Sequence, residues 1–382
     1  MDFVLGGEHE SIRRAARDLV ERQIEPRASA LDISGEFPWE NARDLAGLGY
    51  FGLHVPEEYG GLGADSLALA LVIEEIARGC ASTALMYEVH CSLCSESILK
   101  FGTDEQKRKY LPALASGEAL GAFALTEPGA GSDAGSLQTV ATLKGDHYVL
   151  DGRKCFITNG NTAGVIVIFA ITDKTKGVKG ISAFIVEKGF PGFKPGRVED
   201  KMGLRASSAA EIFLDGCIVP RENLLGEEGE GFRVAMTSLE AGRIGVAAQA
   251  TGIARAALEA AAGYAKRRVQ FNQPISGFQA IQFMLADMAT DIEASRNLYQ
   301  KAAWMHAQGM RCAKEAAMAK MFASSMAVRH CADAIQIHGG YGYMREFKVE
   351  RYLRDAKVTE IYEGTNEIMK VIISGQALRE IS

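Results

Sequence analysis

Apolar residues recur at helical spacing through the first third of the chain. The clearest example is "DSLALALVIEEIARGCASTALMYEV" (65–89), and the glycine-rich stretch "HVPEEYGGLG" (54–63) marks a connection before it. The N-terminal stretch predicts an amphipathic helix with one apolar stripe formed by Leu5, Ile12, Ala16, Leu19 and Val20. These patterns predict an N-terminal α-helical domain over residues 1–120.

The pattern changes to alternation and β-branched runs at about residue 121. Strands are predicted in "GAFALTE", "HYVLDGRKCFIT", "GVIVIFAIT", "ISAFIVE" and "AEIFLDGCIVP". In the second of these, Asp151-Gly152 lies between two alternating arms, which is typical of a hairpin turn. A middle β domain is therefore expected over residues 121–228.

Helical spacing returns after "PRENLLGEEGEGF" (220–232) and continues to the end. It appears in long pieces such as "IQFMLADMATDIEASRNLYQKAAWMHAQG" (281–309), and four long helices predict a bundle over residues 229–382. The β unit then lies between two helical units that can share packing, so the expected fold is α+β and multidomain.

Length and composition narrow the possible functions. The chain has 382 residues, more than the ~250–300 that a single core supports, so several core units are expected. Its 47% hydrophobic residues are dispersed, without the run of roughly 18 apolar residues that a membrane helix needs. The net charge of −6 and the scattered Lys and Arg give no concentrated basic face for nucleic acid. We therefore expect neither a membrane protein nor a nucleic-acid-binding protein.

Targeting and cysteine content both indicate a reducing compartment. The N-terminus lacks the basic-then-apolar order of a signal peptide, so a cytoplasmic protein is expected, while a processed mitochondrial matrix protein stays open. Seven cysteines are an odd number and favour free thiols. Cys91 and Cys94 in "HCSLC" have the spacing of a redox or zinc pair, but their apolar flanks favour small core residues.

Three glycine-containing stretches are candidates for ligand binding. "FALTEPGAGSDAGS" (123–136) is longer than a hairpin needs and lets backbone N–H groups approach a ligand, although a structural turn is the alternative. "RRVQFNQPISGFQAIQF" (267–283) offers arginine forks for phosphate, or simply a helix C-terminus. "QIHGGYGYM" (336–344) exposes backbone, and its His338 is either a proton carrier or a buried or capping residue. The chain has neither GxGxxG after a strand nor GxxxxGK[ST], which excludes Rossmann and P-loop sites.

The stretch "TEIYEGTNEI" (359–368) places Glu363 between Tyr362 and Gly364 without a basic residue nearby in sequence. Such a carboxylate is either a solvated surface charge or a desolvated base, because an apolar environment raises the pKa of a carboxyl group.

Seven stretches together resemble one enzyme family. They are "FALTEPGAGSDAG", "FITN", "LEAGRIGVAAQATGIA", "RRVQFNQPI", "FQAIQF", "QIHGGYGY" and "RDAKVTEIYEGTNEI". In order and spacing they are similar to the acyl-CoA dehydrogenase family, especially its short-chain, butyryl-type members. The resemblance implies an N-terminal helical domain, a middle β-barrel-like domain and a C-terminal four-helix bundle.

The same resemblance implies an FAD cofactor held between the β domain and the bundle. It also implies a homotetramer, a dimer of dimers, in which a neighbouring subunit completes the cofactor site. Thr126 and Thr158 are expected to hydrogen-bond the flavin ring, and Arg268 is expected to reach the nucleotide across the interface. The full expected cofactor set is Phe123, Leu125, Thr126, Gly131, Ser132, Phe156, Ile157, Thr158, Arg268, Phe271, Gln279, Gln336, Gly339, Gly340, Thr365, Asn366 and Glu367.

Catalysis is also assigned by resemblance. Glu363 is expected to remove the α-proton of a short-chain, branched or alicyclic acyl-CoA while the β-hydrogen leaves as hydride to flavin N5, giving the trans-2-enoyl-CoA. Some members carry the base where this chain has Gly242, and glycine cannot serve. The expected substrate contacts are Ser132, Glu240, Arg243, Tyr362 and Gly364.

Several alternatives stay open at this point. Phe156 stands where many members have tryptophan, and Glu240 where an aspartate is common, which leaves the coenzyme A contact open. An electron-transfer flavoprotein is the expected electron acceptor, with an acyl-CoA oxidase or another reaction of the same fold as the alternative. A non-catalytic scaffold is the alternative from a different class. No metal is expected.

Overall fold

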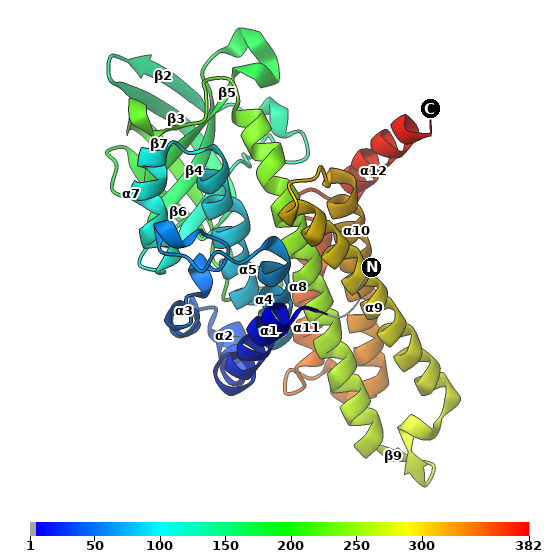
Figure 1. Cartoon of the computed structure of the whole chain (residues 1–382). Coiled ribbons are helices and arrows are strands. Elements are labelled where there is room, and N and C mark those ends of the chain that lie inside the picture. Colours follow the sequence, from blue (N-terminus) through cyan, green and yellow to red (C-terminus); the bar gives the residue numbers. More distant parts are fainter. Residues whose placement is uncertain (1–4, 382) are drawn as a thin grey trace.

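The computed structural model describes residues 5–381, which form two helical regions joined through a sheet (Figure 1). The N-terminal region begins with a helical run whose Ala16 and Val20 are buried, as the predicted stripe requires, whereas Leu5 precedes the first helix. Short π-helical turns at Val20–Ile24 and Val89–Ser95 join neighbouring α-helices. The helices are α1 (Gly7–Leu19), α2 (Glu25–Ser34), α3 (Trp39–Gly47), α4 (Ser66–Gly79), α5 (Ala81–Glu88), α6 (Glu96–Phe101) and α7 (Asp104–Ala115).

The middle region is an eight-stranded sheet with its own apolar core. Its pairing order is β6-β7-β3-β2-β4-β5-β8, and β1 pairs with β4 in parallel. Residues from β1 to β7 face one shared interior, as expected of a barrel-like domain. The strands are β1 (Gly121–Ala124), β2 (Val140–Lys144), β3 (His147–Thr158), β4 (Val165–Ile171), β5 (Ile181–Glu187), β6 (Phe193–Val198), β7 (Ala209–Pro220) and β8 (Leu224–Leu225).

The hairpin predicted at Asp151-Gly152 is wrong. Strand β3 runs through both residues, and the turn between β2 and β3 is two residues long, with Gly145 at φ +66°. The β3–β7 register shifts between Leu150 and Gly152, so Asp151 lies in a bulge and its carboxylate accepts from the Gly216 N–H at 2.8 Å. A β-carbon at Gly152 would lie 2.4 Å from the Thr139 hydroxyl oxygen, so this glycine permits close packing rather than a turn.

The C-terminal region contains four helices of at least 15 residues among those described, as predicted, with lengths of 37, 29, 26 and 15 residues. A nine-residue helix lies between the last two of them, because the Gly339–Tyr343 turn and the segment around Glu363 interrupt the chain. The elements are α8 (Gly231–Arg267), β9 (Val269–Gln270), β10 (Gln273–Pro274), α9 (Gln279–Ala307), α10 (Ala313–His338), α11 (Val349–Lys357) and α12 (Asn366–Glu380).

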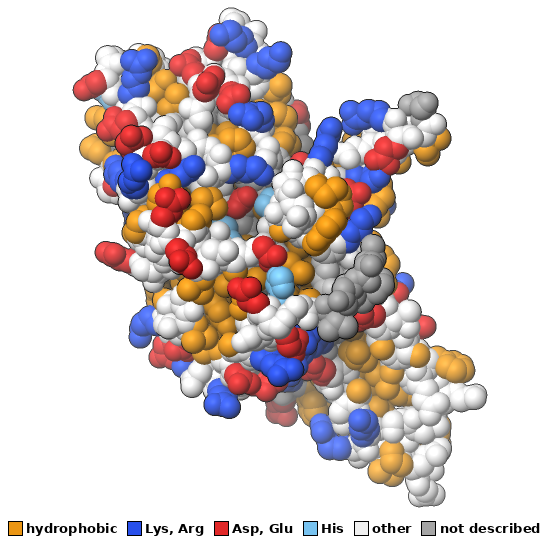
Figure 2. All heavy atoms as spheres, in the orientation of Figure 1, with side chains coloured by type: hydrophobic (Ala, Val, Ile, Leu, Met, Phe, Trp, Pro, Cys, Tyr) orange, Lys and Arg blue, Asp and Glu red, His pale blue; other side chains and the backbone are white. Residues whose placement is uncertain are grey.

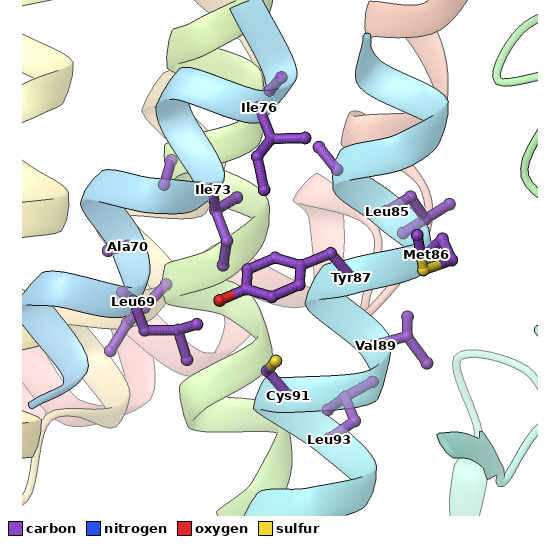
Figure 3. Packing of buried hydrophobic residues seen from close by; sticks show 14 of the residues in the cluster. Leu69, Ala70, Ile73, Ile76, Leu85, Met86, Tyr87, Val89, Cys91 and Leu93 are labelled. Atoms are coloured by element: carbon purple, nitrogen blue, oxygen red, sulfur yellow. The ribbon is translucent and has the colours of Figure 1, made fainter. Parts of the chain in front are cut away.

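Helix α8 is the central element that joins the regions. It packs against α4 and α5 of the N-terminal region, β5 of the sheet, and α9, α10 and α11 (Figure 1). Figure 3 shows the apolar layer between α4 and α5, where Tyr87 lies between the two helices and its hydroxyl donates to the Tyr50 carbonyl at 2.9 Å. The predicted core role of Cys91 and Cys94 is confirmed, because both thiols are buried and face carbonyl oxygens.

A buried ionic cluster fastens α4 to the C-terminal helices. The Glu74 carboxylate accepts from Arg296 at 2.7 Å, from the more distant Arg255 at 3.4 Å, and from the Tyr299 hydroxyl. These partners keep the pKa of Glu74 below its usual value although burial acts in the opposite direction. The cluster therefore fixes how the two helical regions meet.

The outer surface carries mixed charges. In Figure 2, Lys and Arg side chains alternate with Asp and Glu over the visible face, and no large area of one sign appears. None of the described helices is long and apolar enough to cross a membrane. The expected cytoplasmic location stays a prediction.

Candidate active site

Glu363 lies in a strained turn between α11 and α12. Its φ is +54°, in the left-handed region that side chains other than glycine rarely adopt, and Gly364 follows at φ +103°. A backbone of this kind costs of order 1–3 kcal/mol and persists where the surrounding structure enforces it. The turn aims the Glu363 side chain away from solvent and onto α8.

The Glu363 carboxylate rests on a glycine of α8. A β-carbon at Gly242 would lie 2.2 Å from Glu363 Oε2 and 2.8 Å from Leu93 Cδ2, so only glycine leaves room for the carboxylate. Both oxygens are hidden from solvent, and no donor among the described residues reaches them. Loss of water raises the pKa of Glu363 to about 7, which makes it a stronger base than a solvated carboxylate.

Two cations hold the backbone of this turn. Arg243 Nε donates to the Glu363 carbonyl at 3.2 Å, and Lys320 Nζ donates to the Gly364 carbonyl at 2.8 Å. Both side chains are buried, and burial lowers the pKa of Lys320 to about 8. Their charges oppose the rise in the pKa of Glu363. The cations therefore fix the turn without ion-pairing to the carboxylate.

The predicted substrate contacts fall into two groups. Tyr362, Arg243 and Gly364 lie at the Glu363 turn, and the Tyr362 hydroxyl donates to Gln249 on α8. Glu240 is half-buried one turn before Arg243, facing Cys312, and burial raises its pKa. Ser132 is exposed on the loop after β1. The structure thus gathers three of the five at the carboxylate.

The predicted cofactor residues of the middle domain lie on the loop after β1 and on the end of β3, which a hydrogen bond from the Cys155 N–H to the Thr126 carbonyl joins. The loop is not a β1–β2 hairpin, because β1 pairs with β4. Phe156 is 66% exposed at φ +58°, where the register of β3 shifts, while Thr126 and Thr158 are half-buried and Gly131 is open. The side chains of Phe123 and Ile157 belong instead to the apolar cores, so only their backbone can face a ligand.

A second group lies at the far end of α8. Arg268, Gly339, Gly340 and neighbouring residues line a hollow of about 600 Å³, with the Arg268 guanidinium 5.5 Å from the centre of the Tyr341 ring. No carboxylate within residues 5–381 forms an ion pair with Arg268. His338 is buried and stacks on Tyr264, which confirms the buried or capping role. The hollow therefore offers an uncompensated cation and open backbone.

Other predicted cofactor residues are scattered. Three of them are on the surface near this end of α8, namely Gln336, Gln279 and the 88% exposed Phe271. Leu125 is half-buried after β1, and Glu367 is exposed on α12. Thr365 caps α12 by accepting from the Ile368 N–H, and the buried Asn366 accepts from Lys320 at 3.0 Å. Figure 1 shows the β9 end of the bundle far from the sheet, so one chain does not bring Arg268 to Thr126 or Thr158.

Sequence reasoning missed two buried charged residues at the site, Glu88 and Lys320. Glu88 ends α5 and faces Glu363, and burial beside that carboxyl group raises its pKa well above the usual value. The available signal was a lone charge within an apolar helical run, "ALMYEVHC" for Glu88 and "AAMAKMFA" for Lys320.

Three protein-family models match this chain. They are the N-terminal domain of acyl-CoA dehydrogenase over residues 6–118, the middle domain over 122–217 and the C-terminal domain over 229–378. Together they span both helical regions and the sheet.

Individual relatives agree over nearly the full length. The short-chain specific acyl-CoA dehydrogenase of Clostridium acetobutylicum is 48% identical over 379 residues, covering 99% of this chain and all of the relative. The structure of butyryl-CoA dehydrogenase from Megasphaera elsdenii has a TM-score of 0.98 at 47% identity, covering 99% and 100% of the two chains. A chain in the structure of the electron transferring flavoprotein of Acidaminococcus fermentans has a TM-score of 0.98 at 50% identity, with the same coverage.

The raised pKa of Glu363 predicts that this residue destabilises the protein at alkaline pH. A folded pKa near 7 against an ordinary value of 4.5 means that the folded state holds the proton more tightly, so stability is lost as pH rises through this window. The difference corresponds to roughly 3 kcal/mol. Glu363→Gln should therefore raise the thermal midpoint at pH 8 and raise it much less at pH 5. An equal midpoint for both proteins at pH 8 would contradict a desolvated carboxylate.

Proposed function

The chain belongs to the acyl-CoA dehydrogenase family, and from this premise we propose that it oxidises a short-chain acyl-CoA to the trans-2-enoyl-CoA with Glu363 as the base. The observation that carries the proposal is the Glu363 carboxylate itself, which is withdrawn from water and has no cation bonded to it. A general base must reach a C–H bond in a site that excludes water, and a pKa near 7 matches that role.

Residues around Glu363 also supply groups for the thioester. The Glu363 backbone N–H has no acceptor among residues 5–381, so it is free to donate to the thioester carbonyl as negative charge develops there. Arg243 and Lys320 hold the neighbouring carbonyl groups, which fixes the direction of this N–H. Proton removal and charge stabilisation thus come from one rigid turn.

Members of the family are FAD-dependent, and the residues present fit that cofactor. The exposed Phe156 ring and the half-buried Thr126 and Thr158 offer a face and two hydroxyls, while Arg268 with the Gly339–Gly340 backbone offers an anion site. FAD, when bound, supplies the acceptor for the β-hydrogen.

These two halves lie apart in one chain, so we propose that a second copy in a homotetramer supplies the Arg268 half. We also propose an electron-transfer flavoprotein as the electron acceptor. The similarity to a chain in the A. fermentans flavoprotein structure supports this acceptor.

The short acyl chain is proposed from two observations. The relative from C. acetobutylicum is named short-chain specific, and the neighbour from M. elsdenii is a butyryl-CoA dehydrogenase. In this chain, Leu93 lies against the Gly242 position beside Glu363, and Leu239 and Tyr362 belong to the same apolar cluster. These apolar side chains suit an aliphatic acyl group, and the names of the two relatives support a short one.

Glu363→Gln should remove nearly all turnover while leaving FAD and acyl-CoA binding close to wild type. Glutamine keeps the volume and the backbone donor but cannot take the proton, and loss of a general base typically costs about 10²–10⁴ in rate. The measurement is anaerobic flavin bleaching with butyryl-CoA.

Gly242→Glu in a Glu363→Gly background is the matched test, because position 242 faces the same carboxyl group and a side chain there needs the space that the residue 363 side chain fills. Partial recovery would place both positions around one α-carbon. If Glu363→Gln alone kept more than about a tenth of the rate, well above what loss of a general base permits, the proposed mechanism would fail.

Arg268→Ala should lower FAD occupancy and loosen the oligomer together. The guanidinium has no carboxylate partner among residues 5–381, and a charge-assisted contact to phosphate is worth about 1.5–3 kcal/mol. Flavin absorbance per chain and sedimentation velocity measure the two effects. The exposed Arg14, which forms an ion pair with Glu10 on α1, gives a control variant, Arg14→Ala. Full flavin content with unchanged sedimentation would rule out a shared site.

Butyryl-CoA should exceed palmitoyl-CoA in kcat/KM by a wide margin, as for an enzyme similar to short-chain and butyryl-CoA dehydrogenases. A panel of acyl-CoA thioesters of increasing length, with branched and alicyclic members, measures this. Faster bleaching by palmitoyl-CoA or by a cyclic thioester would exclude the linear short-chain substrate and leave the reaction class intact.

A further inference from the structure

Glu88 is a fully buried acid that the proposed reaction does not use. It ends α5 within the continuous helical run from Ala81 to Phe101, and its side chain has no exposed surface. Both of its carboxyl oxygens lack a donor among the described residues. A buried polar group without a partner is costly, so its presence in an otherwise apolar helix requires an explanation.

Two glycines of α8 make room for the two acids. Gly242 lies against the Glu363 carboxylate, and a β-carbon at Gly245 would lie 2.6 Å from Glu88 Cγ and 2.7 Å from Glu88 Oε1. Residues three apart on a helix share a face and are separated by ~4.5 Å along the axis. The glycines therefore seat the two carboxyl groups side by side on one face of α8.

Two ionised carboxylates cannot hydrogen-bond to each other, and no other donor among the described residues reaches any of the four oxygens. A single proton between them satisfies both groups at once, since one carboxyl then donates to the other. We propose that Glu88 and Glu363 share one proton, and that neutral Glu88 is a positioning residue that donates to the Glu363 carboxylate. This inference rests on the proposed role of Glu363 as the base.

The surrounding charges decide which of the two acids keeps the proton. Arg243 and Lys320 act on Glu363 and favour its ionised form, whereas the groups that interact with Glu88, besides Glu363, are Ser92, the Cys91 thiol and the Tyr362 phenol. Burial raises the pKa of both acids, but that of Glu88 rises further. A hydrogen bond donated by Glu88 would lower the pKa of Glu363 and so preserve the base at neutral pH.

The first test is the pH dependence of anaerobic flavin reduction by butyryl-CoA in the holoenzyme. Glu88→Gln keeps a donor and should leave the rising limb of the profile near its wild-type position. Glu88→Met keeps the length but removes the donor, so the limb should move upward by about one pH unit, the equivalent of one charge-assisted hydrogen bond. Glu96→Gln is the control, since Glu96 is also an acid of this helical run with a pKa raised by burial, and Glu363 does not act on it.

The second test needs no turnover. In the infrared difference spectrum of wild type minus Glu88→Gln at pH 7, the proposal predicts a protonated carboxyl band that shifts in D₂O. A carboxylate band in its place, or a Glu88→Met profile that coincides with wild type, would overturn the shared proton. Persistent turnover in Glu363→Gln would instead show that the proposed function has failed, and the infrared result would still decide the state of Glu88.

Discussion

The absence of a side chain at Gly242 is the constraint on which the site depends. Helix α8 packs against helices of both helical regions and against the sheet. A glycine inside such a helix lowers its stability by about 1 kcal/mol relative to alanine and adds no side-chain packing. The space that it leaves is filled by the Glu363 carboxylate, which is thereby removed from water. Close packing in α8 is what turns an ordinary glutamate into a base.

The remaining parts of the site hold this carboxylate in place. The left-handed conformation of Glu363 directs its side chain inward, and Arg243 and Lys320 bind the backbone carbonyls of Glu363 and Gly364. The ionic cluster at Glu74 fixes α4 against α8 and α9, and α5 follows α4 in the chain. The position of α5, whose last residue Glu88 faces Glu363, therefore depends on contacts between the N-terminal and C-terminal helical regions.

Periodicity predicted the order of the three regions because each buries its own apolar face, and the glycine stretches indicated the open loop after β1 and the hollow at Arg268. The sequence pattern wrongly predicted a hairpin turn at Asp151-Gly152. A bulge and a turn favour the same residues, and only the pairing with strand β7 distinguishes them. The meeting of Glu88 with Glu363 could not be predicted either. It joins residues 275 positions apart through the spacing of two glycines on a third element.

The most direct measurement of the central claim is exchange of the α-hydrogen of butyryl-CoA with solvent in D₂O, followed by mass spectrometry on the anaerobic holoenzyme. The account predicts deuterium uptake at the α-carbon with wild type and none above the protein-free rate with Glu363→Gln, under conditions where both proteins bind the thioester. Equal uptake by the two proteins would show that another group removes the proton.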